Sequence, residues 1–296
     1  MTPDFWENIE GNNYNCRILV SPYNKRITVS NYSFDNGSRK SDAHNSTNNA
    51  HNGVAGMVSA LIVKALNHGL DKVWLNTPIK WVEHFKEAGM KLEAIIPGFY
   101  KNREAAYFLS AFLSPERKAP SLKEGPRRNL SPFPDNGEPS RRLGEITLTW
   151  GKPEHCQSLA GLYGKVFSTY PFPIFDPGYV KHTMDKNVRY IIAWDSERIV
   201  ASAAAETDPI NKNAELTDFA TLPEYRSRGL AKTLLEKLEQ HLKRKKYHCL
   251  YTIARSGSIG MNKTFQDSGY AFQGILVKNC NISGNLEDMN VWSKVI

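Results

Sequence analysis

A loop with the sequence RSRGLA, residues 226–231, has the residue types of an anion-binding site. It follows an apolar run that Pro223 closes, and it precedes a segment whose leucines recur at helical spacing. The first amides of a helix have no partner within the helix and carry the positive end of its dipole. Gly229 lets a ligand approach the backbone, and Arg226 and Arg228 supply charge. These features predict a binding site for a pyrophosphate.

The pattern differs from the common phosphate-binding motifs. No G-K-[ST] follows it, as in a Walker A loop, and it is not a G-x-G-x-x-G dinucleotide motif. The same residues could begin an ordinary helix by coincidence. The order of strand, proline, loop and long amphipathic helix favours the ligand-binding interpretation.

The composition indicates a globular protein. The 296 residues are 41% hydrophobic and 11% aromatic, which suits two domains of ordinary size. No segment has the apolar length of a membrane span, and the first residues do not resemble a signal peptide. The four cysteines lack CxxC spacing, so we expect reduced thiols, no metal site and a cytoplasmic protein.

The formal net charge of +8 suits either nucleic acid or a polyanionic cofactor. Many of the cationic residues lie in one proline-rich segment, and no nucleic-acid module is recognisable. We therefore expect neither a nucleic-acid partner nor a membrane. A monomer and a homodimer both remain open.

The chain divides into two parts. Residues 1–113 form the expected N-terminal domain, and residues 114–145, with six prolines, form a basic linker. Within the first domain, residues 35–53 are almost all Asn, Ser, His, Gly and charge, which predicts a mobile polar insertion of undetermined role. Residues 146–296 form the second domain.

The second domain has a recognisable order of elements. The expected strands are 146–150, 189–194, 199–206, 215–222, 249–253, 273–278 and 289–292, and the expected helices are 153–167, 230–242 and 258–267. This order and the R-x-x-G-x-A loop resemble the GNAT superfamily of N-acetyltransferases over residues 145–296. The resemblance implies an α/β (α+β) acyl-CoA N-acyltransferase fold with acetyl-CoA as co-substrate.

Within that superfamily, several segments are similar to the β-lysine N-acetyltransferase family. They are LTDFATLPEYR at 216–226, YPFP at 170–173, S-x-GMN at 258–262, MNVW at 289–292 and IPGFY at 96–100. The resemblance implies transfer of acetyl from acetyl-CoA to the ε-amine of β-lysine, giving the compatible solute Nε-acetyl-β-lysine. A small-molecule amine is the partner that it implies.

Two alternatives stay open. One is a GNAT acetyltransferase for another small amine, a polyamine or protein lysines. The other is a non-catalytic CoA-binding protein, which Phe265 weakly favours because many members carry a proton-donating tyrosine at that place. Water, Tyr251, Tyr270 or Tyr170 could replace it.

Three carboxylates are candidate catalytic residues. The resemblance implies that acids near the loop strand receive the amine proton, and Glu215, Asp218 and Glu206 are available there. In a regular strand Glu215 and Asp218 face opposite sides, so both can serve only if a bulge intervenes. Which of the three is the base is undetermined, and at least one could be an ordinary surface carboxylate.

The remaining site residues follow from the same resemblance. The expected cofactor-binding residues are Phe219, Thr221, Arg226, Ser227, Arg228, Gly229, Leu230, Ala231, Lys232 and Asn262. The expected substrate-binding residues are Tyr170, Phe172, Asp176, Phe99 and Tyr100.

The two domains share a pattern. Phe85-x-x-x-Gly89 and Phe265-x-x-x-Gly269 each end a short helix before a strand of like spacing. The N-terminal domain is therefore interpreted as a degenerate GNAT-like copy that covers the active site, although chance similarity is an alternative. Its counterpart of the loop, residues 49–54, lacks the arginines, so we expect no cofactor there.

Overall fold

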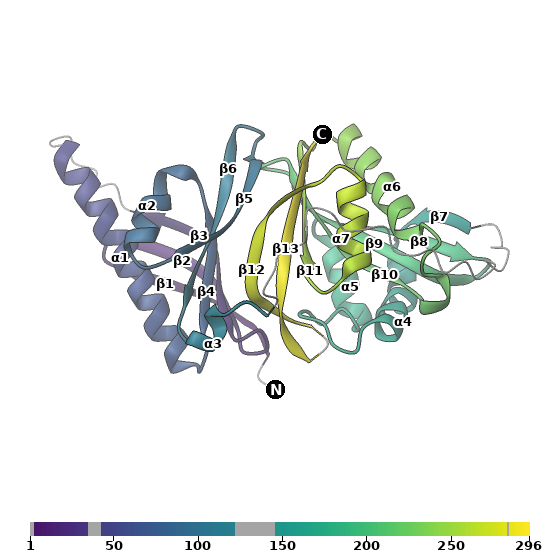
Figure 1. Cartoon of the computed structure of the whole chain (residues 1–296), viewed down its shortest axis with the longest axis horizontal. Helices are drawn as coiled ribbons and strands as arrows, with labels where there is room; N and C mark the ends of the chain where they lie inside the picture. Colours follow the sequence, from purple (N-terminus) through teal and green to yellow (C-terminus); the bar gives the residue numbers. More distant parts are fainter. Residues whose placement is uncertain (1–2, 35–42, 122–145, 283) are drawn as a thin grey trace.

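The computed structural model describes residues 3–34, 43–121, 146–282 and 284–296. Its strands form one sheet of 13 strands (Figure 1). The strand order is β1-β2-β3-β4-β6-β5-β12-β13-β11-β10-β9-β8-β7. Strands β1–β6 belong to the N-terminal half and strands β7–β13 to the C-terminal half.

The N-terminal half contains six strands, one long helix and two short helices in its described residues. Its elements are β1 (Phe5–Gly11), β2 (Tyr14–Ser21), β3 (Arg26–Phe34), α1 (Ala43–Asn67), β4 (Lys72–Thr77), α2 (Ile79–Glu87), β5 (Lys91–Tyr100), β6 (Glu104–Phe112) and α3 (Pro115–Lys118). Helix α1 forms because its apolar stripe packs on β2 and β3, with Val54, Met57 and Leu61 fully buried.

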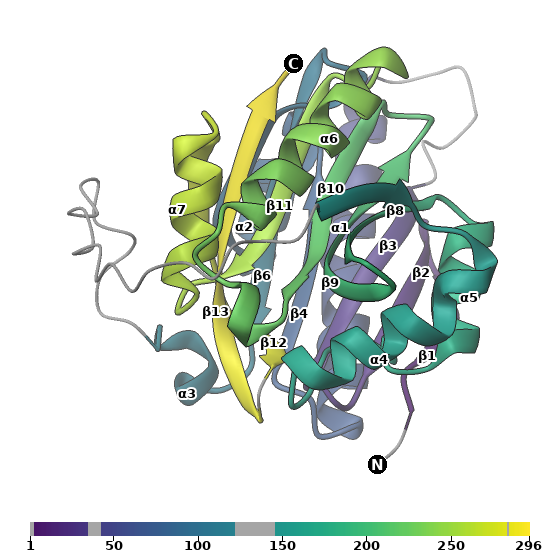
Figure 2. The same ribbon diagram turned by 90° about the vertical axis from the view of Figure 1, so that its right-hand side faces the viewer.

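The C-terminal half has the expected order of elements. They are β7 (Ile146–Trp150), the 3₁₀ turn η1 (Pro153–His155), α4 (Cys156–Val166), α5 (Pro177–Asp185), β8 (Val188–Asp195), β9 (Arg198–Asp208), β10 (Asn213–Thr221), the 3₁₀ turn η2 (Pro223–Tyr225), α6 (Leu230–Arg244), β11 (Cys249–Arg255), α7 (Ile259–Asp267), β12 (Ala271–Ile282) and β13 (Asn285–Val295). Helix α6 lies against β9 and β10 through its buried leucines (Figure 2).

The two halves repeat one connectivity. In the N-terminal half, β3 passes through α1 to the parallel strand β4, and α2, β5 and β6 follow. In the C-terminal half, β10 passes through α6 to the parallel strand β11, and α7, β12 and β13 follow. The spatial orders β3-β4-β6-β5 and β10-β11-β13-β12 correspond. The two halves thus share the connectivity and strand order of one half-fold, which is compatible with the predicted second copy.

Part of the expected polar insertion is helical. Helix α1 begins at Ala43, so residues 43–53 are not the loop predicted for them, whereas residues 35–42 lie outside the described part. Once the apolar turns from Val54 onward are packed, each preceding residue extends an existing helix and needs no new nucleus. Most of the expected linker also lies outside the described residues; its start, 115–118, forms α3. The domain boundaries therefore stay predictions.

The halves meet where β5 runs beside β12. Gly274 pairs with Ala94, the one register pair found between these strands in the described chain, and its φ is +145°. An added Cβ at Gly274 would overlap the carbonyl oxygen of Glu93. The junction core contains Ile96, Phe108 and Leu276. The two backbones can approach this closely because residue 274 has no side chain.

Buried charges from the N-terminal half hold the irregular part of β12. The Lys72 ammonium lies 2.9 Å from the Glu93 carboxylate and donates to the carbonyl of Val277 at 2.8 Å. The Val277 amide donates to Glu93 at 2.6 Å. Burial lowers the pKa of Lys72 to about 8. The register of β12 shifts between residues 276 and 280, so these bonds replace ladder bonds and fix the bulge that follows the junction.

Replacing Gly274 with alanine is expected to lower the free energy of unfolding by at least about 1–3 kcal/mol, because the side chain meets rigid backbone at a positive φ. Chemical denaturation monitored by circular dichroism measures this. The matched control is Gly161→Ala on the exposed face of α4, where no atom lies within 4 Å and alanine should be neutral or stabilising. Equal stability of the two variants would contradict the close approach of β5 and β12.

Candidate active site

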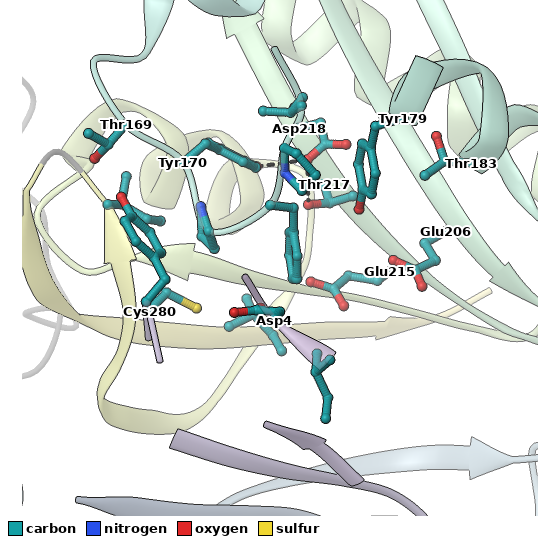
Figure 3. Close-up of a pocket in the computed structure, with 18 of the residues that line it drawn as sticks. Asp4, Thr169, Tyr170, Tyr179, Thr183, Glu206, Glu215, Thr217, Asp218 and Cys280 are labelled. Atoms are coloured by element: carbon teal, nitrogen blue, oxygen red, sulfur yellow. Dashed lines mark hydrogen bonds between the residues drawn. The ribbon is translucent and has the colours of Figure 1, made fainter. Parts of the chain in front are cut away.

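A cavity of about 850 Å³ lies between the two halves. The N-terminal half contributes Asp4, Arg26 and Trp74 to its lining, and the C-terminal half contributes tyrosines and carboxylates (Figure 3). The three candidate catalytic acids all line it. Glu206 comes from β9, and both Glu215 and Asp218 come from β10. The cavity is thus strongly acidic.

A bulge in β10 brings Glu215 and Asp218 to the same cavity. The register between β10 and β9 shifts between Thr217 and Ala220, and Asp218 has a φ of +54°. The bulge that a shared site requires is therefore present. Tyr170 holds the turned carboxylate by donating its hydroxyl to Oδ1 of Asp218 at 2.7 Å. The Thr217 hydroxyl donates to the same oxygen at 3.3 Å.

Burial raises the pKa of all three carboxylates, and neighbouring negative charge adds to it for the two glutamates. Burial is the largest cause for Glu215, and the charges of Glu206 and Asp218 add to it, which raises its pKa to about 8. Burial, followed by the charge of Asp218, raises the pKa of Glu206. Burial also raises the pKa of Asp218, although the hydrogen bonds from Tyr170 and Thr217 oppose this. A cation entering the cavity would stabilise the charged carboxylates, so the cluster favours an ammonium group.

Strands β10 and β11 part next to these acids. Their parallel ladder joins residues 213–215 to residues 249–251, although β10 continues to Thr221 and β11 to Arg255. The last pair in the described ladder is Glu215 with Tyr251. Phe219 lies beyond the separation and packs its ring 5.5 Å from that of Phe265. The opening leads from Glu215 toward the start of α6.

The loop 226–231 presents backbone amides at the start of α6. Gly229 caps the helix with a φ of +77°, and the amide of Thr233 makes the first helical bond, to the carbonyl of Gly229. The amides of residues 230–232 precede that bond, and the N-cap position supplies no side-chain hydrogen bond. A Cβ at Gly229 would meet no atom within 4 Å, so the space over the loop is open.

The arginines of the loop are positioned by local contacts. The guanidinium of Arg226 donates to the carbonyl of Thr221 at 3.2 Å. The guanidinium carbon of Arg228 lies 5.2 Å from the centre of the Tyr225 ring, and the hydroxyl of that ring donates to Asp195. Amides and two cations around an open space are the donors that a pyrophosphate needs. The loop therefore fits the diphosphate group of CoA. Leu230 can contribute its amide alone, because its side chain lies in the core.

The side chain of Asn262 is hydrogen-bonded within the protein. Its amide nitrogen donates to the carbonyls of Arg255 and Ser258, both at 2.8 Å. Its oxygen accepts from Asn290 and from the Trp292 indole, both at 2.8 Å. The side chain is 2% exposed and its two donors and two acceptor sites are used. The structure therefore gives Asn262 a structural role, joining α7 to β11 and β13, and its expected binding of the cofactor stays a prediction.

Three of the five expected substrate residues lie elsewhere. Asp176 accepts from the amide of Gly178 as the N-cap of α5. Phe99 is buried in the junction core, where its ring packs against Tyr251 and Phe108. Tyr100 donates its hydroxyl to Asn76 at 2.7 Å. None of the three is among the described lining residues, so the structure does not bring them to this cavity and their role in substrate binding stays a prediction.

Tyr170 and Phe172 do line the cavity, with several residues that the sequence did not single out. These are Asp4, Arg26, Trp74, Tyr179 and Tyr190. Asp4, Arg26 and Trp74 come from the N-terminal half and have no motif around them. Tyr179 lies on α5 immediately after the proline-rich segment, which is the one local signal that could have placed it.

Two structural features limit the chemistry. Phe265 is 1% exposed and has no hydroxyl, whereas Tyr251 lies opposite Glu215 where the strands part.

No group of three or more histidine, cysteine, aspartate or glutamate side chains in the described ranges could hold a metal ion. Over the same ranges, no helix is long and apolar enough to cross a bilayer.

Comparison with known proteins agrees with this geometry. The model of the Acetyltransferase (GNAT) family matches residues 154–270. The chain is 40% identical over 228 residues to beta-lysine N(6)-acetyltransferase of Methanococcus maripaludis, covering 76% of this chain and 83% of that protein. It is 38% identical over 159 residues to the protein of that name from Methanosarcina mazei, covering 54% and 59% of the two chains. It is 44% identical over 149 residues to N-acetyltransferase YodP of Bacillus subtilis, covering 50% and 54%.

Proposed function

The chain belongs to the β-lysine N(6)-acetyltransferase family of the GNAT superfamily, and on that premise we propose that it acetylates the ε-amine of β-lysine with acetyl-CoA. The observation that carries the proposal is the cluster of Glu206, Glu215 and Asp218 in one cavity beside the opening of β10 and β11. β-Lysine has two ammonium groups, which suit such a cluster.

Glu215 is the proposed base. It lies at the last paired position of β10, nearest the opening, and its pKa is about 8 because of burial and its acidic neighbours. An approaching ammonium favours the charged form of Glu215, and this carboxylate is then placed to accept the proton of the ε-ammonium. A base with a pKa near the working pH is the most effective one. Glu206 and Asp218 keep the basicity high and attract the cation.

Acetyl-CoA supplies the acetyl group as a thioester. The amides of residues 229–232 with Arg226 and Arg228 are proposed to bind its pyrophosphate. The stretch of β10 after Glu215, which includes Phe219 and Thr221 and no longer pairs with β11, is proposed to receive the pantetheine arm. This arrangement directs the thioester toward the carboxylates, so the protein acts chiefly by holding the two reactants together. A cytoplasmic location belongs to the same proposal and is supported by four free cysteines.

The direct test compares substrates. Specificity constants are measured for β-lysine, α-lysine, a polyamine and a lysine peptide, and NMR locates the acetyl group in each product. β-Lysine is expected to be preferred and to be acetylated at the ε-nitrogen, because binding of the remote amino-acid end positions the reacting amine. Preference for the polyamine or the peptide, or acetylation at the β-amine, would contradict the substrate assignment and leave acetyl transfer itself intact.

The loop is tested by Gly229→Val, which places a side chain in the open space over the amides. We expect CoA to bind roughly 10- to 100-fold more weakly by calorimetry, the loss that corresponds to one charge-assisted hydrogen bond of about 1.5–3 kcal/mol. Gly89→Val is the matched control, since Gly89 also has a positive φ and no neighbour within 4 Å but ends α2 in the other half. If the folded Gly229 variant binds CoA as tightly as the control does, the cofactor site lies elsewhere.

A further inference from the structure

The cavity contains one cation among many acids. Of its described lining residues, Arg26 is the sole lysine or arginine, and it lies beside Trp74 on strands β3 and β4 of the N-terminal half, whereas the carboxylates come from β9 and β10. Resting on the proposed function, we propose that Arg26 binds the carboxylate of the substrate, so that the N-terminal half determines specificity for an amino acid over a simple diamine. The ε-amine is then left for the acids of β9 and β10.

Arg26 has no carboxylate partner of its own. It is 5% exposed and lies near two other buried cations, Lys72 and Arg117. Lys72 is paired with Glu93 at 2.9 Å and Arg117 with Asp71 at 2.6 Å. Within the described part of the chain, no ion pair joins Arg26 to an acid. Burial raises the pKa of Asp4 and of Glu215 and the charge of Arg26 opposes this, but neither acid forms an ion pair with it. Among the described residues the guanidinium therefore lacks a direct acidic partner, which the substrate carboxylate would supply.

The guanidinium is held in place with bonding capacity left. Its Nη1 donates to the carbonyl of Asn279 at 2.5 Å, and its central carbon lies 5.1 Å from the Trp74 ring centre. Its Nε is buried and has no hydrogen-bond partner in the described residues. Arginine can bind a carboxylate through two parallel bonds, which needs a fixed guanidinium plane. One bond to β12 and the neighbouring indole restrict that plane.

The position of Arg26 suits a substrate that spans the cavity. Its Nη1 lies 3.5 Å from the sulfur of Cys280, and Figure 3 places Cys280 on the far side of the cavity from Glu206. Glu215 lies on the side of Glu206 in the same view. A β-lysine molecule with its carboxylate at Arg26 therefore has its long arm directed toward the carboxylates and the opening of β10 and β11. Binding at one end then aims the amine at the other.

The test uses two substrates that differ in the carboxylate. In 1,4-diaminopentane a methyl group replaces the carboxymethyl group of β-lysine, and both amines and the chain between them stay the same. Wild-type protein is expected to prefer β-lysine by roughly 10- to 100-fold in kcat/KM. Arg26→Gln should remove most of this preference by lowering kcat/KM for β-lysine while leaving that for the diamine nearly unchanged. Arg103→Gln, at an exposed arginine in the turn after β5, is the control and should keep the wild-type preference.

Three results would overturn the inference. They are equal use of both substrates by the wild type, a parallel loss on both substrates in Arg26→Gln, and an unchanged preference in that variant. If Arg26→Gln does not fold, Arg26→Lys is the deciding variant, because lysine keeps the charge but cannot form the two parallel bonds. The preference for β-lysine over the diamine should then fall several-fold. An unchanged preference in Arg26→Lys would contradict the inference. Failure of the wild type to acetylate β-lysine at all would instead refute the proposed function.

Discussion

Burial of three carboxylates in one cavity is the constraint on which the rest of the site depends. Burial is the largest cause of the raised pKa of Glu206, Glu215 and Asp218, and the charge of Asp218 adds to it for the two glutamates. The fold produces this arrangement with a bulge, which turns Asp218 toward the cavity and requires the hydrogen bond from Tyr170. The same irregular stretch of β10 runs beside the opening to β11. The irregular stretch of β10 therefore accounts both for the binding of the substrate cation and for the place where the thioester can reach it.

The two halves have taken different roles. In the C-terminal half a loop with open amides joins β10 to α6. In the N-terminal half, residues 49–54, the expected counterpart of that loop, lie inside helix α1, where their backbone belongs to the helix. What this half contributes is a wall: Arg26 and Trp74 line the cavity, and the Lys72–Glu93 pair fixes the bulge of β12 that carries Asn279. One sheet through Gly274 keeps that wall in register with the carboxylates.

The features that were predictable from sequence are those set by short-range pattern. The leucine spacing of α6, the glycine at its start and the matching Phe-x-x-x-Gly ends of α2 and α7 predicted the loop, the fold and the repeat. Positions set by tertiary contacts were not predictable. Asn262 was expected to bind the cofactor because the sequence cannot show its hydrogen bonds to Asn290 and Trp292, which lie on strand β13. Phe99 and Tyr100 belong to the segment IPGFY, which resembles the family, but in the structure this segment packs in the core where the two halves meet. Arg26 was missed because its importance comes from a cavity that the other half completes.

The most direct test of this account is the titration of Glu215 itself. With glutamate labelled at the side-chain carboxyl carbon, NMR follows each carboxylate against pH, and Glu215→Gln identifies its signal. The account predicts a pKa of about 8 in the free protein, a lower value in Glu206→Gln, and a fall when β-lysine binds. A value near 4.5 in the free protein, or a raised value that β-lysine leaves unchanged, would contradict the claim that the carboxylate cluster is built to receive the substrate ammonium.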